Sequence, residues 1–368
     1  MEQLARPEST AGRKANLLFV TSSLYFGGAQ KVTFILADAL ADQYNVTVAY
    51  CFDAGRNYPF HNKCTVRKLP DYDRNAGVME KVICIGKQIR ALKALKEELK
   101  TDVSVSLGNL SNYLNAMSKG REYVICSERS NPSKSWQNLF FLTKRAFRRA
   151  DYVVFQSEAV RNLFAESVRR KSCILKNPVL IPGPAGQQRT KKIVTLGRLT
   201  AQKNHALLIR SFARFRQSHP SYELYIYGDG ELKAQLRQLI DSLGLSSCVF
   251  LEGNDPQVHD HIRDAEMFVL SSDYEGLSNA LLECMAMGLA CVSTACEGSV
   301  DVIRSGENGL LVPLHDEAAL AAAMGSLADD PELRRRLENR AYEDMKAYDK
   351  AIVTKDWEQV IRKGIAER

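Results

Sequence analysis

Short apolar segments alternate with amphipathic stretches along almost the whole chain, and this alternation constrains the fold more than any other feature. Residues 17–20 predict a buried strand, and the stretch after them carries apolar side chains at helical spacing from Val32 to Leu40. Further strands are predicted at residues 46–50, 103–107, 123–126 and 152–155. Before residue 103 lies a long predicted helix whose inward face we expect to hold Val82, Ile85, Ile89, Leu92 and Leu99. Strands that alternate with helices predict a parallel sheet covered on both faces.

A segment rich in proline and glycine, residues 178–188, interrupts this alternation and predicts a linker between domains. The alternation then resumes, with strands predicted at residues 193–196, 223–227, 249–251, 267–270 and 290–293. Because 368 residues exceed the size of one ordinary domain, we expect two Rossmann-like domains in tandem. The chain ends in a predicted amphipathic helix that contains Trp357.

The charge is unevenly distributed. Residues 1–190 hold 29 Lys and Arg against 16 Asp and Glu, a net charge of +13, and the remainder hold 21 against 27, a net charge of −6. Such a basic half suits a polyanionic partner (nucleic acid, anionic lipid or a pyrophosphate), or it is a solvated surface. The first fifteen residues lack the apolar core of a signal peptide, and no stretch approaches the roughly 18 apolar residues that span a bilayer. Nine scattered cysteines without metal spacing agree with a cytoplasmic protein.

Polar residues follow two of the predicted strands in the second half. In parallel sheets, ligands collect at the carboxyl ends of the strands. After residues 193–196, Gly197 frees the backbone, and Arg198 and Lys203 can converge on an anion. After residues 267–270 comes Glu275, just before a predicted helix. The residues that follow Glu275 offer free amides at the first helical turn, suited to a phosphate or a sugar hydroxyl; they are Gly276, Leu277 and Ser278.

Glu283 lies two turns further along, within an apolar run. A buried carboxylate needs a partner, which is either a ribose diol or a neighbouring Arg or Lys. In the first half, Gly27 and Gly28 open a helix and would let the backbone approach a diphosphate, or they form a tight turn. The chain lacks a GxGxxG sequence, which argues against a dinucleotide dehydrogenase. The histidines in the stretch 259–261 have no third metal ligand in the sequence, so we expect no metal and no cofactor.

These elements, together with Gly228-Asp229-Gly230-Glu231, follow the order of the family-4 retaining glycosyltransferases, which the chain therefore resembles. The resemblance covers nearly the whole chain and is strongest from residue 197 to residue 311. It implies an α/β protein of the GT-B fold, with two Rossmann-like domains facing across a cleft. The implied boundaries are residues 1–182 for the acceptor domain, 183–346 for the donor domain and 347–368 for a helix packing back on the first domain.

The resemblance also implies the role of each site residue. Arg198 and Lys203 would neutralise the donor diphosphate in place of a metal, and Glu275 would contact the transferred sugar. Glu283 would hold the ribose. The remaining donor-binding positions would be Gly27, Gly28, Tyr227, Gly228, Gly276, Leu277 and Ser278. The implied reaction moves a hexose or N-acetylhexosamine, with retention, from a nucleotide-linked donor, with UDP favoured.

The acceptor side is predicted from Glu128 and Arg129, which follow the strand at residues 123–126. Many members of the family carry His where this chain has Arg129, and Arg cannot shuttle a proton at neutral pH, so we expect Arg129 to bind phosphate. The stretch resembles transferases that build surface polysaccharide or protein-linked glycans on a polyprenyl-pyrophosphate carrier. Arg145 and Arg148 share a predicted basic helix with Phe140 and Phe141 nearby, which suits an anionic membrane surface or simply a solvated face. We therefore expect a peripheral protein on the cytoplasmic face of the membrane.

Two other classes remain open at this point. An epimerase or a phosphorylase can use the same pair of domains, and product analysis with and without an acceptor separates them from a transferase. A non-catalytic basic binding protein would explain the positive half. The chain has none of the common nucleic-acid-binding signatures, and we expect no nucleic-acid partner.

Overall fold

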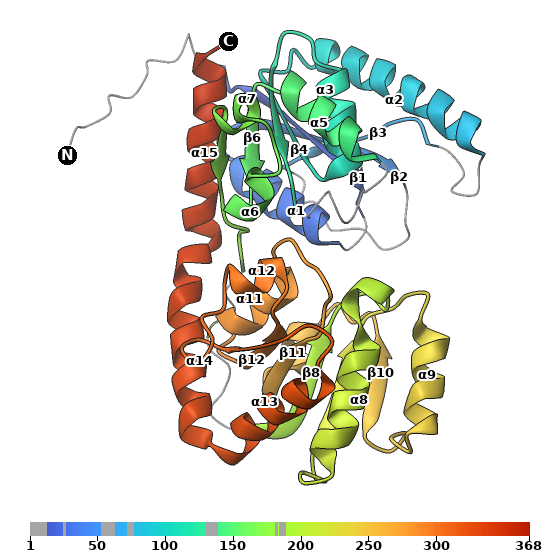
Figure 1. The fold of residues 1–368 in the computed structure, drawn as a ribbon. Coiled ribbons are helices and arrows are strands. Elements are labelled where there is room, and N and C mark those ends of the chain that lie inside the picture. Colours follow the sequence, from blue (N-terminus) through green and yellow to red (C-terminus); the bar gives the residue numbers. More distant parts are fainter. Residues whose placement is uncertain are drawn as a thin grey trace, which may run out of the picture. The chain divides into compact units, whose positions relative to one another are not determined.

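The computed structural model describes residues 13–24, 27–52, 63–71, 77–129, 139–180, 183 and 189–368. The chain divides into two compact units (Figure 1). Met1–Leu175 and Thr354–Arg368 form the N-terminal unit, and Lys176–Val353 form the C-terminal unit. Each unit is a parallel sheet with helices, which confirms the predicted pair of Rossmann-like domains.

The N-terminal unit contains a seven-stranded sheet in the order β3-β2-β1-β4-β5-β6-β7. Its strands are β1 (Asn16–Ser23), β2 (Asn45–Phe52), β3 (Thr65–Lys68), β4 (Val103–Leu107), β5 (Tyr123–Ser127), β6 (Tyr152–Phe155) and β7 (Ser172–Ile174). Its helices are α1 (Gly28–Leu40), α2 (Val78–Glu98), α3 (Asn109–Met117), α5 (Phe140–Arg149), α6 (Glu158–Arg161) and α7 (Glu166–Arg169). Helix α3 packs against both α2 and α5. The strand order reverses between β1 and β4, and the carboxyl ends of such a pair are where ligands bind in open parallel sheets.

The C-terminal unit contains a six-stranded sheet in the order β10-β9-β8-β11-β12-β13. Its strands are β8 (Thr190–Leu196), β9 (Glu223–Tyr227), β10 (Val249–Gly253), β11 (Ala265–Leu270), β12 (Ala290–Thr294) and β13 (Leu310–Val312). Its helices are α8 (His205–Arg216), α9 (Lys233–Ser242), α10 (Val258–His261), α11 (Asn279–Ala286), α12 (Glu297–Val300), α13 (Glu317–Asp329) and α14 (Pro331–Met345), with single 3-10 turns η2 (Ala201–Lys203) and η3 (Lys346–Tyr348). Apolar side chains of β8, β9, β11 and α8 form one core of this unit. The reversal of strand order falls here between β8 and β11.

The last helix, α15 (Lys350–Ala366), begins in the C-terminal unit, and its residues from Thr354 onward belong to the N-terminal unit. Trp357 on this helix is fully buried. Tyr44 of the N-terminal unit donates a hydrogen bond to Glu358 at 3.2 Å, and Gly364 leaves room for the ring of Tyr123. None of the helices in the described ranges combines the length and the apolar character needed to cross a membrane.

The prediction of which side chains α2 turns inward was wrong for Val82. Val82, predicted to be inside, is 60% exposed, whereas Gln88 and Lys96 are buried. Gln88 donates a hydrogen bond to the Pro70 carbonyl at 2.8 Å, and Lys96 forms an ion pair with Glu122 at 2.7 Å. Apolar spacing does not reveal these partners, because they come from other parts of the chain.

Candidate active site

Two loops at the carboxyl edge of the C-terminal sheet are tied together by hydrogen bonds. Gln202 donates to the Tyr274 carbonyl at 2.9 Å, and the Asp273 amide donates to the Gln202 carbonyl at 2.9 Å. Asn204, which has a left-handed backbone and caps α8, donates to the Asp273 carboxylate at 2.7 Å. The loops after β8 and β11 are therefore one structural element, although they are about 70 residues apart in the sequence.

This element brings Lys203 and Glu275 into direct contact. The Lys203 ammonium lies 2.5 Å from Glu275 Oε1, and both side chains are largely buried. Ser272 donates a second hydrogen bond to the same carboxylate oxygen at 2.9 Å. The aliphatic part of Lys203 lies against Gly197, where a Cβ atom would be 3.1 Å from Lys203 Cε. Arg198 follows Gly197 and is exposed. The loops after β8 and β11 therefore carry both this exposed cation and the largely buried ion pair of Lys203 and Glu275.

The backbone near Gly228 can form only without a side chain at that position. Gly228 has φ +140°, and a Cβ atom there would lie 1.9 Å from the Gly197 carbonyl oxygen. The Gly197 amide donates to the Tyr227 carbonyl at 2.9 Å, and the Gly228 amide donates to the Gly253 carbonyl at 2.7 Å. Burial raises the pKa of Tyr227 to about 12, so its hydroxyl stays protonated at neutral pH. The loops after β8, β9 and β10 therefore meet at Gly228.

Residues 276–278 connect Glu275 to helix α11. Ser278 is the N-cap of this helix, and its hydroxyl accepts a hydrogen bond from the Leu281 amide at 3.4 Å. A Cβ atom on Gly298 would lie 1.4 Å from the Gly276 carbonyl oxygen, so α12 packs against this connection without any side chain between them. Leu277 is partly buried against the apolar core of this part of the unit.

Glu283 lies in α11 and is 9% exposed. Its Oε2 atom is 2.7 Å from His259 Nε2. Among the described residues, His259 is thus one partner of Glu283, and a histidine was not considered from the sequence. His261, on the same short helix, instead pairs with Asp255.

In the N-terminal unit, the predicted residues follow β1 and β5. Gly27 is the N-cap of α1 with an extended backbone, and its carbonyl accepts from the Lys31 amide at 2.8 Å. Gly28 is the first residue of that helix and is exposed.

Glu128 and Arg129 come directly after β5. Glu128 is 1% exposed, and its carboxylate accepts a hydrogen bond from the Arg129 amide at 3.0 Å. The Arg129 guanidinium lies over the ring of Trp357, 5.3 Å from its centroid. Burial lowers the pKa of Arg129 to about 9, which still leaves it charged at neutral pH. Residues 130–138, which directly follow Arg129 in the sequence, lie outside the described residues.

Arg145 and Arg148 lie on α5 and are exposed. Arg145 and Arg148 project from α5, which packs on α3, whereas Glu128 and Arg129 directly follow strand β5. The four residues predicted for the acceptor side thus come from two different places in the N-terminal unit. No group of three His, Cys, Asp or Glu side chains within the described ranges could hold a metal ion.

Comparison with known proteins gives the class of this site. Residues 183–344 match the family model described as "Glycosyl transferases group 1". The chain is 28% identical over 358 residues to the N-acetylgalactosamine-N,N'-diacetylbacillosaminyl-diphospho-undecaprenol 4-alpha-N-acetylgalactosaminyltransferase of Campylobacter jejuni, which covers 91% of this chain and 96% of the relative. It is 26% identical to a second C. jejuni protein, the GalNAc-alpha-(1->4)-GalNAc-alpha-(1->3)-diNAcBac-PP-undecaprenol alpha-1,4-N-acetyl-D-galactosaminyltransferase, covering 93% and 97% of the two chains. The chain is thus similar to glycosyltransferases over most of its length, and its residues 183–344, fewer than half of the chain, match group 1.

Solved structures share the fold. Anabaena Alr3699/HepE, described in complex with UDP and glucose, has a TM-score of 0.80 at 16% identity, covering 95% of this chain and all of the other. The sucrose-phosphate synthase of Thermosynechococcus elongatus has a TM-score of 0.81 at 16% identity, covering 96% and 100%. These structures confirm the predicted GT-B fold. The resemblance to glycosyltransferases is borne out by the family model and the two relatives, and the assignment to family 4 stays a prediction.

Several residues of this site were absent from the sequence interpretation. Gln202, Asn204 and Asp273 hold the two loops together, and Gly298 gives the loop at Gly276 its space. A glycine within a helix of only four residues, α12, is a weak signal for such a contact. Gln202, Asn204 and Asp273 gave a stronger signal of contact between the two loops, because both loops were already expected at the same edge of the sheet.

Proposed function

We propose that this glycosyltransferase moves a hexose or N-acetylhexosamine, with retention of configuration, from a UDP-linked donor to a glycan on a polyprenyl-pyrophosphate carrier. The observation that carries the proposal is the Lys203–Glu275 pair, held at the carboxyl edge of β8 and β11. It puts a cation suited to a diphosphate 2.5 Å from a carboxylate suited to a sugar hydroxyl. The named substrates of the two C. jejuni relatives support a lipid-linked acceptor, and the UDP in the Anabaena structure supports the donor.

In the proposed reaction, Arg198 and Lys203 stabilise the negative charge that develops on the leaving diphosphate, which is the task a metal performs in other transferases. The bond between the sugar anomeric carbon and the diphosphate oxygen breaks. A bond from the acceptor oxygen to that carbon forms on the same face, and the acceptor proton passes to the leaving phosphate. Glu275 binds the transferred sugar in this scheme.

We assign the other donor contacts to residues of the same edge. Glu283 accepts hydrogen bonds from the ribose diol, and His259, 2.7 Å away, fixes the orientation of that carboxylate. Tyr227 and Gly228 border the base. The amides of Gly276, Leu277 and Ser278 are assigned to the sugar and diphosphate, and Gly27 and Gly28 are assigned to donor binding as well.

We assign acceptor binding to residues 1–182, donor binding to residues 183–346, and to residues 347–368 the role of packing back on the acceptor domain. The backbone amide of Arg129 donates to the Glu128 carboxylate, its guanidinium lies over the ring of Trp357, and it remains a cation at neutral pH. It is therefore suited to a phosphate of the acceptor carrier. Glu128 would fix this cation in place.

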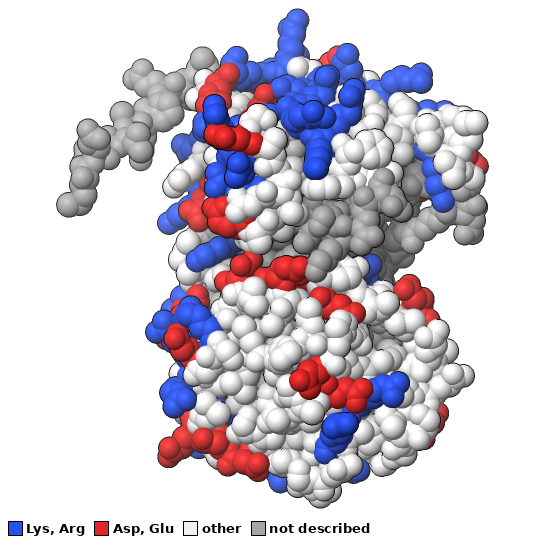
Figure 2. Space-filling model, viewed as in Figure 1, with Lys and Arg blue, Asp and Glu red and all other residues white. Residues whose placement is uncertain are grey.

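Peripheral binding to the cytoplasmic membrane face is supported by the outer layer of the N-terminal unit. Figure 2 shows Lys and Arg side chains gathered on the face of this unit that carries α3, α5 and α7. On α5, Phe141 is 61% exposed beside the exposed Arg145 and Arg148. On α2, four apolar side chains are more than half exposed, namely Val78, Met79, Val82 and Ile83. Exposed apolar groups next to cations are suited to an anionic lipid surface.

The donor assignment is tested by incubating the protein with a panel of UDP- and GDP-linked sugars and a polyprenyl-diphosphate glycan, with and without EDTA, and analysing the lipid by mass spectrometry. We expect acceptor mass to increase by one hexose or N-acetylhexosamine with a UDP sugar, unaffected by EDTA. Sugar isomerisation without an acceptor, or phosphorolysis, would replace the proposal by an epimerase or a phosphorylase. The membrane assignment fails if the protein binds anionic and neutral vesicles equally at low salt.

A further inference from the structure

Asn112, a fully buried residue of α3, forms hydrogen bonds with the last residue of strand β5. The Asn112 side chain accepts a hydrogen bond from the Ser127 amide at 3.1 Å and donates one to the Ser127 carbonyl at 2.8 Å. Strand β4 ends opposite this residue, because Leu107 pairs with Ser127 and the chain then turns at Gly108, where φ is +95°. The asparagine amide has the same donor and acceptor groups as a peptide bond. Asn112 therefore adds a side-chain partner to both backbone groups of Ser127, whose carbonyl also accepts a hydrogen bond from the Gly108 amide at 3.0 Å.

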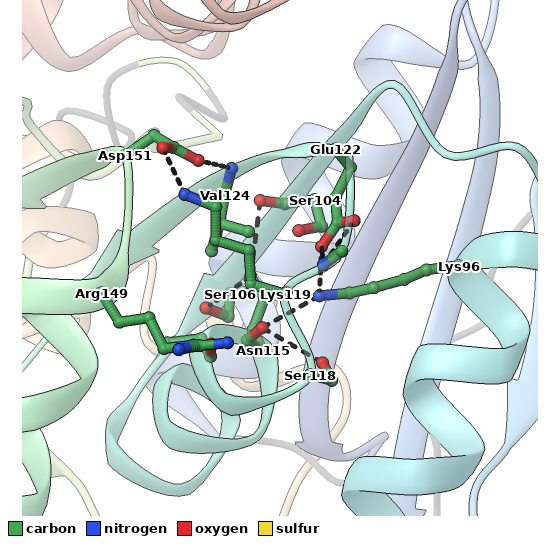
Figure 3. Close-up of polar contacts among 12 residues, drawn as sticks. Lys96, Ser104, Ser106, Asn115, Ser118, Lys119, Glu122, Val124, Arg149 and Asp151 are labelled. Atoms are coloured by element: carbon green, nitrogen blue, oxygen red, sulfur yellow. Dashed lines mark hydrogen bonds and ion pairs between the residues drawn. The ribbon is translucent and has the colours of Figure 1, made fainter. Parts of the chain in front are cut away.

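Buried side chains fix the orientation of this amide. Ser106 donates to Asn112 Oδ1 at 2.8 Å, and Asn115 donates to the Ser106 hydroxyl at 3.1 Å. The backbone carbonyl of Asn115 accepts a hydrogen bond from the Lys96 ammonium, which also pairs with Glu122 at 2.7 Å (Figure 3). A buried polar group that loses its partner costs about 1–3 kcal/mol, so the network strongly favours one orientation of Asn112.

The residue held by Asn112 is the last one before the proposed acceptor residues. Ser127 is further fixed by a hydrogen bond from its hydroxyl to the Val154 carbonyl at 3.1 Å, and the Glu128 amide donates to the same carbonyl at 3.0 Å. Arg129 follows directly, with its guanidinium over Trp357. The backbone from which Glu128 and Arg129 project is thus set by contacts to both neighbouring strands.

We propose that Asn112 is a positioning residue for the acceptor side of the transfer, acting through the main chain of Ser127 on Arg129. The inference rests on the proposed function, because Arg129 has the acceptor phosphate as its ligand there. A displacement of about 1 Å in a binding group can cost up to about a hundredfold in rate, so a loosened Ser127 is expected to affect acceptor use strongly.

The chain offers a matched control one helical turn away. Asn115 is also on α3 and also fully buried, and its amide bonds to Ser106 and to the Ser104 carbonyl, inside the sheet rather than at its edge. Both Asn112→Ala and Asn115→Ala should destabilise the fold. We expect Asn112→Ala to lower kcat/KM for the polyprenyl-diphosphate acceptor by about tenfold or more, and Asn115→Ala, which reaches Asn112 only through Ser106, by a clearly smaller factor. UDP affinity, measured by calorimetry, should be unchanged in both.

A double-mutant cycle with Arg129→Ala separates positioning from general weakening. If Asn112 acts through Arg129, the double variant should be no worse than Arg129→Ala alone. Equal losses in the Asn112 and Asn115 variants, or additive losses in the double variant, would overturn the inference. If Arg129→Ala itself keeps wild-type acceptor kinetics, the acceptor assignment of the proposed function fails instead. Ser106→Ala, a milder change, gives the same test with a smaller expected loss should Asn112→Ala not fold.

Discussion

A buried histidine makes the C-terminal unit sensitive to acid. His205 is the first residue of α8 and is 3% exposed, and within the described part of the chain its Nδ1 atom has no hydrogen-bond partner. Burial, together with the nearby charge of Lys203, lowers the pKa of His205 to about 4 from an ordinary value of 6.5. The start of a helix also disfavours a cation.

The pKa difference sets the size of the effect. Between pH 6.5 and pH 4 the unfolded chain binds a proton at this position and the folded chain does not, so stability is present above pH 6.5 and is lost as the pH falls. Each unit of pKa difference corresponds to about 1.4 kcal/mol, so the full loss is about 3 kcal/mol, of which about 2 kcal/mol is reached at pH 5.

The measurement is urea unfolding of the full chain at pH 7, 6 and 5, followed by circular dichroism. Wild type should lose about 2 kcal/mol more than His205→Gln between pH 7 and pH 5, because the variant lacks the titrating ring. His315→Gln, which removes an exposed histidine of the same unit, is the control and should keep the wild-type acid dependence. Equal losses in wild type and His205→Gln would refute the reasoning.

Further predictions concern the buried ion pair and the donor site. Glu122→Met leaves Lys96 buried without its partner and should cost about 3–5 kcal/mol in urea unfolding, whereas a further change of Lys96 to Met should recover part of that loss rather than add to it. Gly298→Ala puts a methyl group 1.4 Å from the Gly276 carbonyl oxygen, so it should displace this loop and abolish UDP binding in calorimetry while circular dichroism stays near wild type; unchanged UDP affinity would contradict the assignment. Glu283→Ala should weaken UDP binding by about tenfold or more, and a smaller loss with 2'-deoxy-UDP than with UDP would confirm that the lost contact is to the ribose.

The alternation of apolar and amphipathic segments predicted the two parallel sheets but not their edge strands β3, β7 and β13. The strand predicted at residues 17–20 is the buried centre of β1, and residues 193–196 are the second half of β8. The edge of the sheet at which Lys203 and Glu275 meet also followed from the sequence, because strands of a parallel sheet end on the same side.

Contacts between distant polar residues could not be predicted in this way. The face that α2 buries depends on Glu122 and Pro70, which supply partners for Lys96 and Gln88. Likewise, one partner of Glu283 is a histidine 24 residues upstream, on a helix of four residues that has no apolar periodicity of its own. Such pairs become visible only when the backbone has placed both residues.

The central claim is retaining transfer from a UDP sugar to a lipid-linked glycan, and proton NMR of the isolated product tests it most directly. With a UDP-linked N-acetylhexosamine and a polyprenyl-diphosphate acceptor, the account predicts a new glycosidic bond with the anomeric configuration of the donor, lost in Lys203→Ala. A product of inverted configuration, or the same rate of formation in Lys203→Ala, would contradict it.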